Sequence, residues 1–136
     1  AVQLAKFFEA EVTGVCSTAN VALVRSLGAD RVIDYTREDF TSSGDRYDRI
    51  FDTVAKTARS TCLKALTPNG TYWSISKLTA RETPEDLIFL KELIEVGKIK
   101  AVIDRCYPFD QIAEAHRYVE QGHKKGNVVI TVANHP

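Results

Sequence analysis

Two groups of polar residues in this sequence each follow a short apolar segment that is typical of a β-strand. Residues 12–15 alternate as a β-branched strand, and a Cys-Ser-Thr sequence follows at 16–18. A second strand begins near residue 32 and ends at Asp34 and Tyr35. Hydroxyl, thiol and carboxylate groups can hydrogen-bond to a polar ligand. Because ligands of open parallel sheets sit beyond the carboxyl ends of the strands, we expect any site of this chain at these positions.

A helix is predicted between these two strands. Residues 19–27 place Val24 and Leu27 on one face, and Gly28 ends the helix. This is a βαβ unit, whose strands pair in parallel through a right-handed crossover. The alternation continues with a strand at 49–53, a helix at 57–66, a turn at 68–70 and a strand at 71–75. The sequence therefore predicts an α/β fold with a doubly wound parallel sheet, rather than an α+β fold.

The rest of the chain adds an unusually apolar helix and two further strands. Thr83 is typical of a helix cap, Pro84 of the first helical position, and Gly97 of the residue that ends a helix. Apolar residues cover more than one face of this helix, so we expect it to contact a second surface, either a subunit partner or another domain. The remaining predictions are a strand at 101–103, a helix at 110–121 capped by Asp110, and a strand at 128–132.

Length and composition limit the classes of function. The chain has 136 residues, a hydrophobic content of 44%, and 18 basic residues against 18 acidic ones. These values are typical of one globular domain with a core of ordinary size. Since the charges balance, no global field attracts nucleic acid or an anionic membrane, and we expect neither as a partner.

The cysteines and histidines are too scattered to predict a site. Cys16, Cys62 and Cys106 are odd in number and far apart, which argues against a disulfide framework or a CxxC metal site. They favour inert thiols in a reducing cytoplasm. His116 and His123 have no partner at metal-ligand spacing. No nucleophile–base pair can be assembled, so we predict no catalytic residue, no metal ligand and a cytoplasmic protein.

The turn after the first strand has two interpretations. A dinucleotide-binding unit for the unphosphorylated cofactor places Asp or Glu here, to bind the ribose hydroxyls. Residues 16–20 contain no carboxylate, which leaves room for a 2′-phosphate. Alternatively, Ser17 or Thr18 caps the helix that follows, the commonest role for these residues at such a position. The two roles are compatible. The basic loop at 122–127 is likewise either a solvated turn or an anion-contacting loop.

The first residues of the sequence indicate a piece of a longer protein. Ala1, Leu4, Ala5 and Phe8 have helical spacing, and no cap precedes Ala1. We therefore expect the first helix, at residues 1–9, to be cut in its opening turns.

Several segments, taken together and in order, resemble the medium-chain dehydrogenase/reductase superfamily, most closely its quinone oxidoreductase-like, zinc-independent branch. They include LVRSLGADRVIDY, YDRIFDTV, LKALTPNGTY and FLKELIEVGKIKAVIDRCYPFDQIAEAHRYVEQGHKKGNVVITV. The resemblance implies a partial NAD(P)-binding Rossmann domain over residues 1–136. That domain would lack its first strand, which is central in the order 3-2-1-4-5-6, and the glycine-rich turn. Residues 123–136 would be a tail that returns to an N-terminal GroES-like catalytic domain.

The resemblance also implies which residues contact the cofactor. Ser17 and Thr18, with Asn20 nearby, match the turn that receives the adenosine ribose and its phosphate, and Tyr35 matches a tyrosine beside that phosphate. Ala19 departs from the pattern, because many relatives have Arg or Lys there. The other matching positions are the turn after the fourth strand (Asp52, Thr53 and Val54), the end of the fifth strand near the nicotinamide (Ser74 and Ile75), and a C-terminal loop (Lys125 and Asn127).

The resulting hypothesis is the cofactor-binding part of an oxidoreductase that prefers NADP(H), with NAD(H) as the alternative. The whole enzyme would act on a quinone, an enone or a small carbonyl or alcohol, would be a homo-oligomer, and would not need zinc in this segment. The piece itself would be inactive. The rival hypotheses are a non-catalytic nucleotide-binding or oligomerisation module on the same sheet, and a methyltransferase, which usually carries an acid at the end of its second strand.

Overall fold

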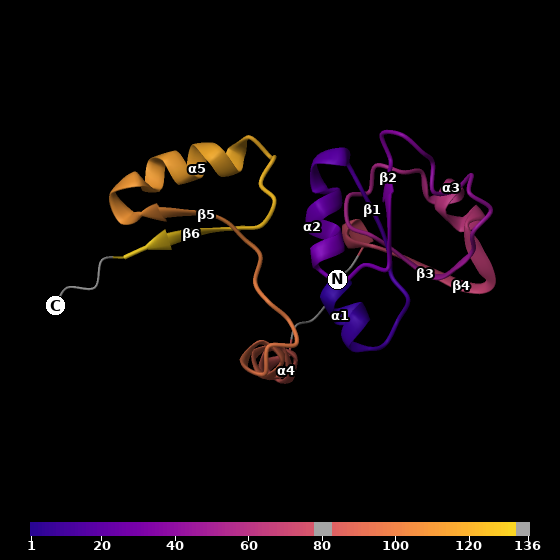
Figure 1. Ribbon diagram of the computed structural model, residues 1–136, viewed down its shortest axis with the longest axis horizontal. Helices are drawn as coiled ribbons and strands as arrows, with labels where there is room; N and C mark the ends of the chain where they lie inside the picture. The colour runs from indigo at the N-terminus through magenta and orange to yellow at the C-terminus, as the bar shows by residue number, and fades with distance from the viewer. Residues whose placement is uncertain (78–82, 133–136) are drawn as a thin grey trace. The chain divides into compact units, whose positions relative to one another are not determined.

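The computed structural model describes residues 1–77 and 83–132, and its strands form three separate parallel pairs. The chain divides into two units, Ala1–Leu87 and Ile88–Pro136, which we describe separately. The first unit contains α1 (Val2–Phe7), β1 (Thr13–Cys16), η1 (Thr18–Asn20), α2 (Val21–Ser26), β2 (Arg31–Asp34), β3 (Tyr47–Asp52), α3 (Arg59–Lys64), β4 (Leu66–Ser74) and η2 (Ile75–Lys77) (Figure 1). Next come α4 (Pro84–Glu95), β5 (Ile103–Pro108), η3 (Phe109–Gln111), α5 (Ile112–Glu120) and β6 (Asn127–Thr131).

The first strand pair is a short βαβ unit. β1 and β2 run in parallel, with Gly14 opposite Val32 and Cys16 opposite Asp34. Ile33 on β2 is buried and belongs to the small core of this unit. Helix α2 lies very close to β1, because a Cβ at position 14 would overlap Val24 Cγ1. Glycine at this position therefore allows the helix and the strand to approach each other.

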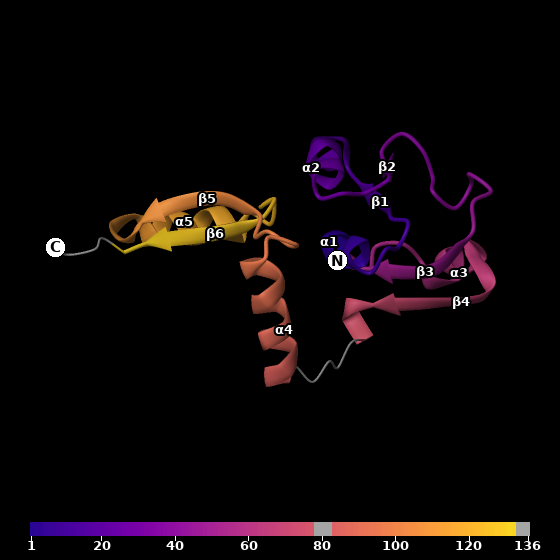
Figure 2. The same ribbon diagram turned by 60° about the horizontal axis from the view of Figure 1, so that its bottom comes forward.

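The second strand pair has an irregular register. Strands β3 and β4 run side by side in the same direction (Figure 2). Tyr47 pairs with Leu66, but Arg49 pairs with Thr71. The predicted turn at 68–70 therefore lies inside β4 as a bulge, where Pro68, which has no N–H to donate, is tolerated. Helix α3 precedes β4 and buries Cys62, whereas the Leu63 side chain is exposed.

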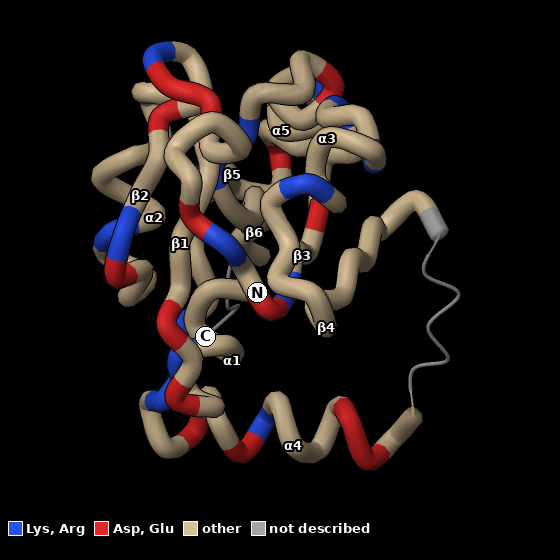
Figure 3. Tube along the Cα trace, turned by 90° about the vertical axis from the view of Figure 1, so that its right-hand side faces the viewer, with Lys and Arg blue, Asp and Glu red and all other residues tan. Residues whose placement is uncertain are grey.

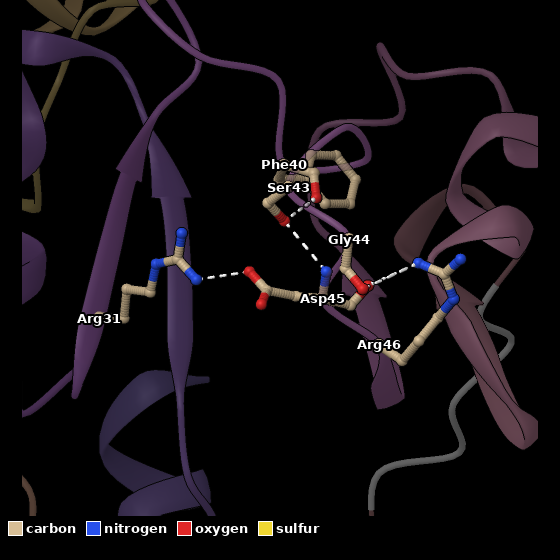
Figure 4. A network of polar contacts seen from close by, with 6 residues as sticks. All are labelled: Arg31, Phe40, Ser43, Gly44, Asp45 and Arg46. Carbon is tan, nitrogen blue, oxygen red and sulfur yellow. Dashed lines mark hydrogen bonds and ion pairs between the residues drawn. The ribbon is translucent and has the colours of Figure 1, made fainter.

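Exposed charges connect the strand pairs of the first unit to their loops. Lys6 Nζ lies 2.8 Å from both carboxylate oxygens of Asp30, and the Val12 N–H donates to Asp30 Oδ2. Arg31, the first residue of β2, forms an ion pair with Asp45 in the loop that leads to β3 (Figure 4). Exposed pairs of this kind stabilise a fold little, so they orient the loop more than they stabilise the protein.

The second unit is held together by a polar cluster as well as by apolar packing. Asp104 on β5 accepts hydrogen bonds from the Tyr118 hydroxyl on α5, at 2.7 Å, and from the Lys125 N–H, at 2.8 Å. The Arg105 guanidinium lies 4.0 Å from the centre of the Tyr118 ring, which is a close cation–π contact. Strand β5 runs from Ile103 to Pro108, beyond the predicted strand at 101–103. Asp110 lies within η3 and is not the predicted cap of α5, whose N-cap is Gln111.

Helix α4 begins and ends as the sequence predicts. The Thr83 hydroxyl accepts a hydrogen bond from the Asp86 N–H, and Asp86 Oδ2 accepts one in return from the Thr83 N–H. This reciprocal pair is a capping box, and the acidic first turn is visible in Figure 3. Gly97 follows the helix with φ +72°, a left-handed conformation that favours glycine. Leu93 is buried, while Leu87, Ile88 and Ile94 are more than half exposed.

The predicted α/β class with parallel strands is confirmed, but a single hydrogen-bonded sheet is not present among the described residues. In the order expected from the resemblance, a further strand separates β1 from β3, so these two strands are not neighbours. The pairing of β1 with β2 and of β3 with β4, as two separate pairs, agrees with that order. No helix of the described residues is long and apolar enough to cross a membrane.

We predict that Gly14→Ala destabilises the fold by about 1–3 kcal/mol, because the new methyl group would overlap Val24 Cγ1. Urea unfolding of the protein at its natural full length measures the change. The matched control uses Val24→Ala, alone and combined with Gly14→Ala. In the Val24→Ala background, adding the methyl group at position 14 should lower the free energy of unfolding much less. An equal cost in both backgrounds would contradict the close approach.

Candidate functional site

Asp34 organises the polar residues at the carboxyl ends of β1 and β2. It is the last residue of β2, and its parallel register with Cys16 brings it beside the turn that follows β1. Asp34 Oδ2 accepts a hydrogen bond from the Thr18 hydroxyl at 2.5 Å. Asp34 Oδ1 accepts hydrogen bonds from the Thr36 hydroxyl at 2.7 Å and from the Thr36 N–H at 3.0 Å. A nearly buried carboxylate therefore lies at the predicted edge of the sheet.

The hydrogen bonds keep Asp34 ionised. The bond from Thr18 and then those from Thr36 hold the pKa of Asp34 below its ordinary value, burial opposes them, and the nearby Arg37 charge adds to the lowering. Since an ionised carboxylate can only accept, both threonines are the donors. Residues 16–20 themselves contain no carboxylate. A carboxylate nevertheless lies beside their turn, because Asp34 reaches it from the neighbouring strand.

Ser17 and Asn20 lie in the same turn without capping the helix. Ser17 is the N-cap residue of η1 and Asn20 that of α2, and neither makes a side-chain capping hydrogen bond. The predicted cap at Ser17 or Thr18 is therefore wrong, because these side chains bond elsewhere. Asn20 Nδ2 donates to Ser17 Oγ at 3.4 Å, and Asn20 Oδ1 is buried without a hydrogen-bond partner among the described residues.

Tyr35 lies at the same edge as this turn. Its N–H donates to the Cys16 carbonyl at 3.0 Å, which continues the parallel pairing for one more residue. Its side chain is 62% exposed, so the phenol is available to a ligand. The structure thus brings together the four residues predicted on the adenosine side of a cofactor, namely Ser17, Thr18, Asn20 and Tyr35.

A second group of predicted residues lies in the turn after β3. Asp52 Oδ1 accepts hydrogen bonds from the N–H groups of Val54, at 3.0 Å, and Ala55, at 2.7 Å, and Oδ2 accepts one from the Tyr72 hydroxyl at 3.0 Å. Burial alone would raise the pKa of Asp52, but these hydrogen bonds outweigh burial and lower it. The turn holds Ala55 at φ +56°, an uncommon conformation for a residue with a Cβ, and leaves Thr53 and Val54 exposed.

Ser74 and Ile75 lie at the same edge as the Asp52 turn. The parallel register pairs Asp52 with Ser74, the last residue of β4. Ser74 is buried, and its Oγ lies 2.9 Å from Ser76 Oγ. Ile75, in η2, is half exposed. The residues predicted near the middle and the nicotinamide end of a cofactor therefore share one edge, which the order of the strands dictates.

Lys125 and Asn127 belong to the second unit. The Lys125 N–H donates to Asp104, and the Asn127 N–H donates to the Val102 carbonyl at 2.7 Å. Both residues lie at the amino end of β6, whereas the other candidate residues follow the carboxyl ends of strands. Their predicted contact with a cofactor stays a prediction.

The described residues contain no group of three His, Cys, Asp or Glu side chains that could hold a metal ion. Burial raises the pKa of Cys16 and of Cys62, and the nearby carboxylates of Asp34 and Asp52 respectively raise it further. Protonated thiols are poor metal ligands and poor nucleophiles. The donors present in the described part of the chain therefore do not fit a zinc ion.

Known proteins resemble this chain in sequence. The family model of zinc-binding dehydrogenases matches residues 27–130. The chloroplastic NADPH-dependent alkenal/one oxidoreductase of Arabidopsis thaliana is 37% identical, over 95% of this chain and 36% of its own length. The mitochondrial NAD(P)H oxidoreductase RTN4IP1 of Bos taurus is 30% identical, over 97% of this chain and 44% of its own. The chain thus spans less than half the length of these relatives.

Solved structures resemble this chain in fold. The quinone oxidoreductase from Coxiella burnetii superimposes with a TM-score of 0.73 and is 25% identical, over 98% of this chain and 48% of the other. A structure described as an NAD-dependent alcohol dehydrogenase gives a TM-score of 0.77 at 22% identity, with 98% of this chain and 47% of the other covered, and supports the fold alone.

The relatives correct one prediction. The expectation of a cytoplasmic protein is wrong, because the relatives in Arabidopsis thaliana and Bos taurus are chloroplastic and mitochondrial. Free cysteines indicate a reducing compartment and do not distinguish the cytoplasm from other reducing compartments.

We predict that Asp34→Asn lowers the midpoint of urea unfolding at pH 7. A carboxylate whose pKa is lower in the folded state stabilises that state above its unfolded pKa, near 4, and loses this contribution as the pH falls through the folded pKa. The difference between wild type and Asp34→Asn should therefore shrink on acidification. Glu38→Gln, an exposed change in the same loop, is the matched control and should show little difference at any pH. A difference in unfolding midpoint between wild type and Asp34→Asn that grows as the pH falls would contradict the hydrogen-bond network around Asp34.

Proposed function

Because this chain belongs to the family of zinc-binding dehydrogenases, we propose that it is the nicotinamide-nucleotide-binding part of an oxidoreductase that prefers NADPH. The observation that carries the proposal is the group of hydroxyls around Asp34 at the carboxyl ends of β1 and β2. Polar groups at the ends of parallel strands are the usual ligand site of such folds. The name of the relative in Arabidopsis thaliana, an NADPH-dependent enzyme, supports the preferred cofactor.

The described residues fit this cofactor in two groups. Ser17, Thr18, Asn20 and Tyr35 would bind the adenosine ribose and its phosphate. The turn at Asp52, Thr53 and Val54, with Ser74 and Ile75 beside it, would lie along the rest of the dinucleotide. The bound cofactor supplies the hydride. These residues orient the cofactor, and none of them is assigned a proton transfer.

The acceptor is proposed from the relatives. Conjugated carbonyl compounds fit best, since the relatives include an alkenal/one oxidoreductase and the 2-methylene-furan-3-one reductase of Solanum lycopersicum. Reduction of such an acceptor adds the hydride to one carbon of the conjugated double bond and a proton to the other end of the system. The residues described here supply neither the acceptor's pocket nor a zinc ion.

We also propose that the protein is a homo-oligomer. Helix α4 supports this, because Leu87, Ile88 and Ile94 are more than half exposed on one short helix. Apolar side chains gathered in this way favour association.

The test of the function uses the protein at its natural full length. We expect it to oxidise NADPH in the presence of a conjugated aldehyde or ketone, and we expect NADH to be a weaker donor, measured as kcat/KM from the absorbance of the reduced nicotinamide. As a control, the isolated segment of residues 1–136 should show no turnover. Tight nucleotide binding by the full-length protein without turnover of any quinone, enone or small carbonyl would favour a non-catalytic binding module and contradict the proposal.

A further inference from the structure

We propose that Arg37 recognises the 2′-phosphate of NADPH, and that Thr18 binds a ribose hydroxyl instead of the phosphate. The inference rests on the proposed function, since it assigns contacts within the same nucleotide site. It addresses a gap in that site: Ala19, in the turn after β1, carries no cation that could pair with a phosphate.

Arg37 is held beside the turn by the carboxylate of Asp34. Its Nε lies 3.6 Å from Asp34 Oδ2, the same oxygen that accepts the hydrogen bond from Thr18 at 2.5 Å. The Arg37 side chain is 76% exposed, whereas that of Asp34 is 12% exposed. The ion pair uses the Nε side of the guanidinium, so the two amino groups are left to bind an anion through two parallel hydrogen bonds.

Two other cations of the first unit, Lys6 and Arg31, form ion pairs away from this turn. Lys6 pairs with Asp30, and Arg31 pairs with Asp45. Both Asp30 and Arg31 lie at the amino end of β2, away from the edge where the candidate residues gather. Arg37 follows the carboxyl end of the same strand, so it is the cation that the contacts place next to Thr18.

The hydrogen-bond network also decides what Thr18 can recognise. Asp34 is ionised and can only accept, so the proton of Thr18 is used in the bond to Asp34. Toward a ligand, Thr18 Oγ1 can then only accept a hydrogen bond. An ionised phosphate offers acceptors, whereas a ribose hydroxyl can donate. Thr18 is therefore suited to the ribose and not to the phosphate.

Ser17 can donate a hydrogen bond to a ligand, whereas Thr18 can only accept one. Its Oγ accepts a hydrogen bond from Asn20 Nδ2 at 3.4 Å, which leaves the hydroxyl proton free to donate. Ser17 and Arg37 thus supply the donors that a 2′-phosphate needs, while the charge of Asp34 is surrounded by donors of its own.

The test measures the binding of two adenine nucleotides, with and without the phosphate, to the full-length protein by calorimetry. Arg37→Gln should weaken the binding of adenosine 2′,5′-bisphosphate about tenfold or more, because a charge-assisted pair is lost, and should leave the binding of 5′-AMP within about twofold. Arg37→Lys should recover part of the loss, because it restores the charge but not the paired geometry. Arg46→Gln is the matched control, since Arg46 donates hydrogen bonds to the carbonyls of Gly44 and Asp45 in another loop, and neither affinity should change.

Thr18→Val tests the second half of the inference. It should weaken the binding of both nucleotides by a similar factor, because both contain the ribose, and Thr18→Ser should restore it. If Arg37→Gln weakens both nucleotides equally or neither, or if Thr18→Val weakens only the bisphosphate, the inference is overturned while nucleotide binding stands. Failure of the wild-type protein to bind either nucleotide would overturn the proposed function itself.

Discussion

The parallel register of β1 against β2 is the constraint on which the candidate site depends. It pairs Cys16 with Asp34, so the turn after β1 and the turn after β2 leave the sheet at the same edge. Asp34 can then bond to Thr18 and Thr36, two residues that are 18 positions apart in the sequence. A shift of one residue would turn the Asp34 side chain to the other face of the sheet relative to β1 and break its bond to Thr18, whereas the bonds to Thr36 are local to the turn after β2. The polar network is therefore a consequence of backbone pairing.

The same pairing explains why so little of this chain is buried. Parallel sheets normally have both faces covered and their inner strands paired on both sides. Here each described strand pairs with one neighbour, and the buried hydrophobic side chains among the described residues are Ile33, Cys62, Ala65, Leu93 and Ala115. Among the described residues, the core is smaller than the one expected from the length. The exposed Val15 and Phe51, on β1 and β3, are apolar residues that a complete doubly wound sheet would cover.

Local patterns predicted the elements well and the longer-range contacts poorly. Strand, helix and turn residues predict the order of the elements, and the predicted helix cap at Thr83 and helix end at Gly97 are confirmed, because helix ends depend on neighbouring residues. The turn at 68–70 was placed between elements, yet it is a bulge in β4, since only the pairing with β3 defines it. The predicted strand at 101–103 is shorter than β5, because residues 104–107, Asp-Arg-Cys-Tyr, look polar. In the structure Asp104 and Arg105 both contact Tyr118 on α5. The resemblance points to Ser17, Thr18 and Tyr35, and the strand pattern places Asp34 at the same edge, but the bond between Thr18 and Asp34 is known only from the structure.

The role of Asp34 shows why residue types alone do not decide the choice of cofactor. A carboxylate in the turn after β1 would ordinarily bind ribose hydroxyls and repel a phosphate, and Asp34 reaches this turn from the end of β2. In this chain the two oxygens of Asp34 accept three hydrogen bonds from Thr18 and Thr36, and Arg37 lies against the same group. The carboxylate therefore does not face a ligand directly: it determines the direction of the Thr18 and Thr36 protons and holds a cation at the edge. An acid and a preference for the phosphorylated cofactor are compatible when the acid is hydrogen-bonded in this way, because Ser17 and Arg37 are left to donate hydrogen bonds to a ligand.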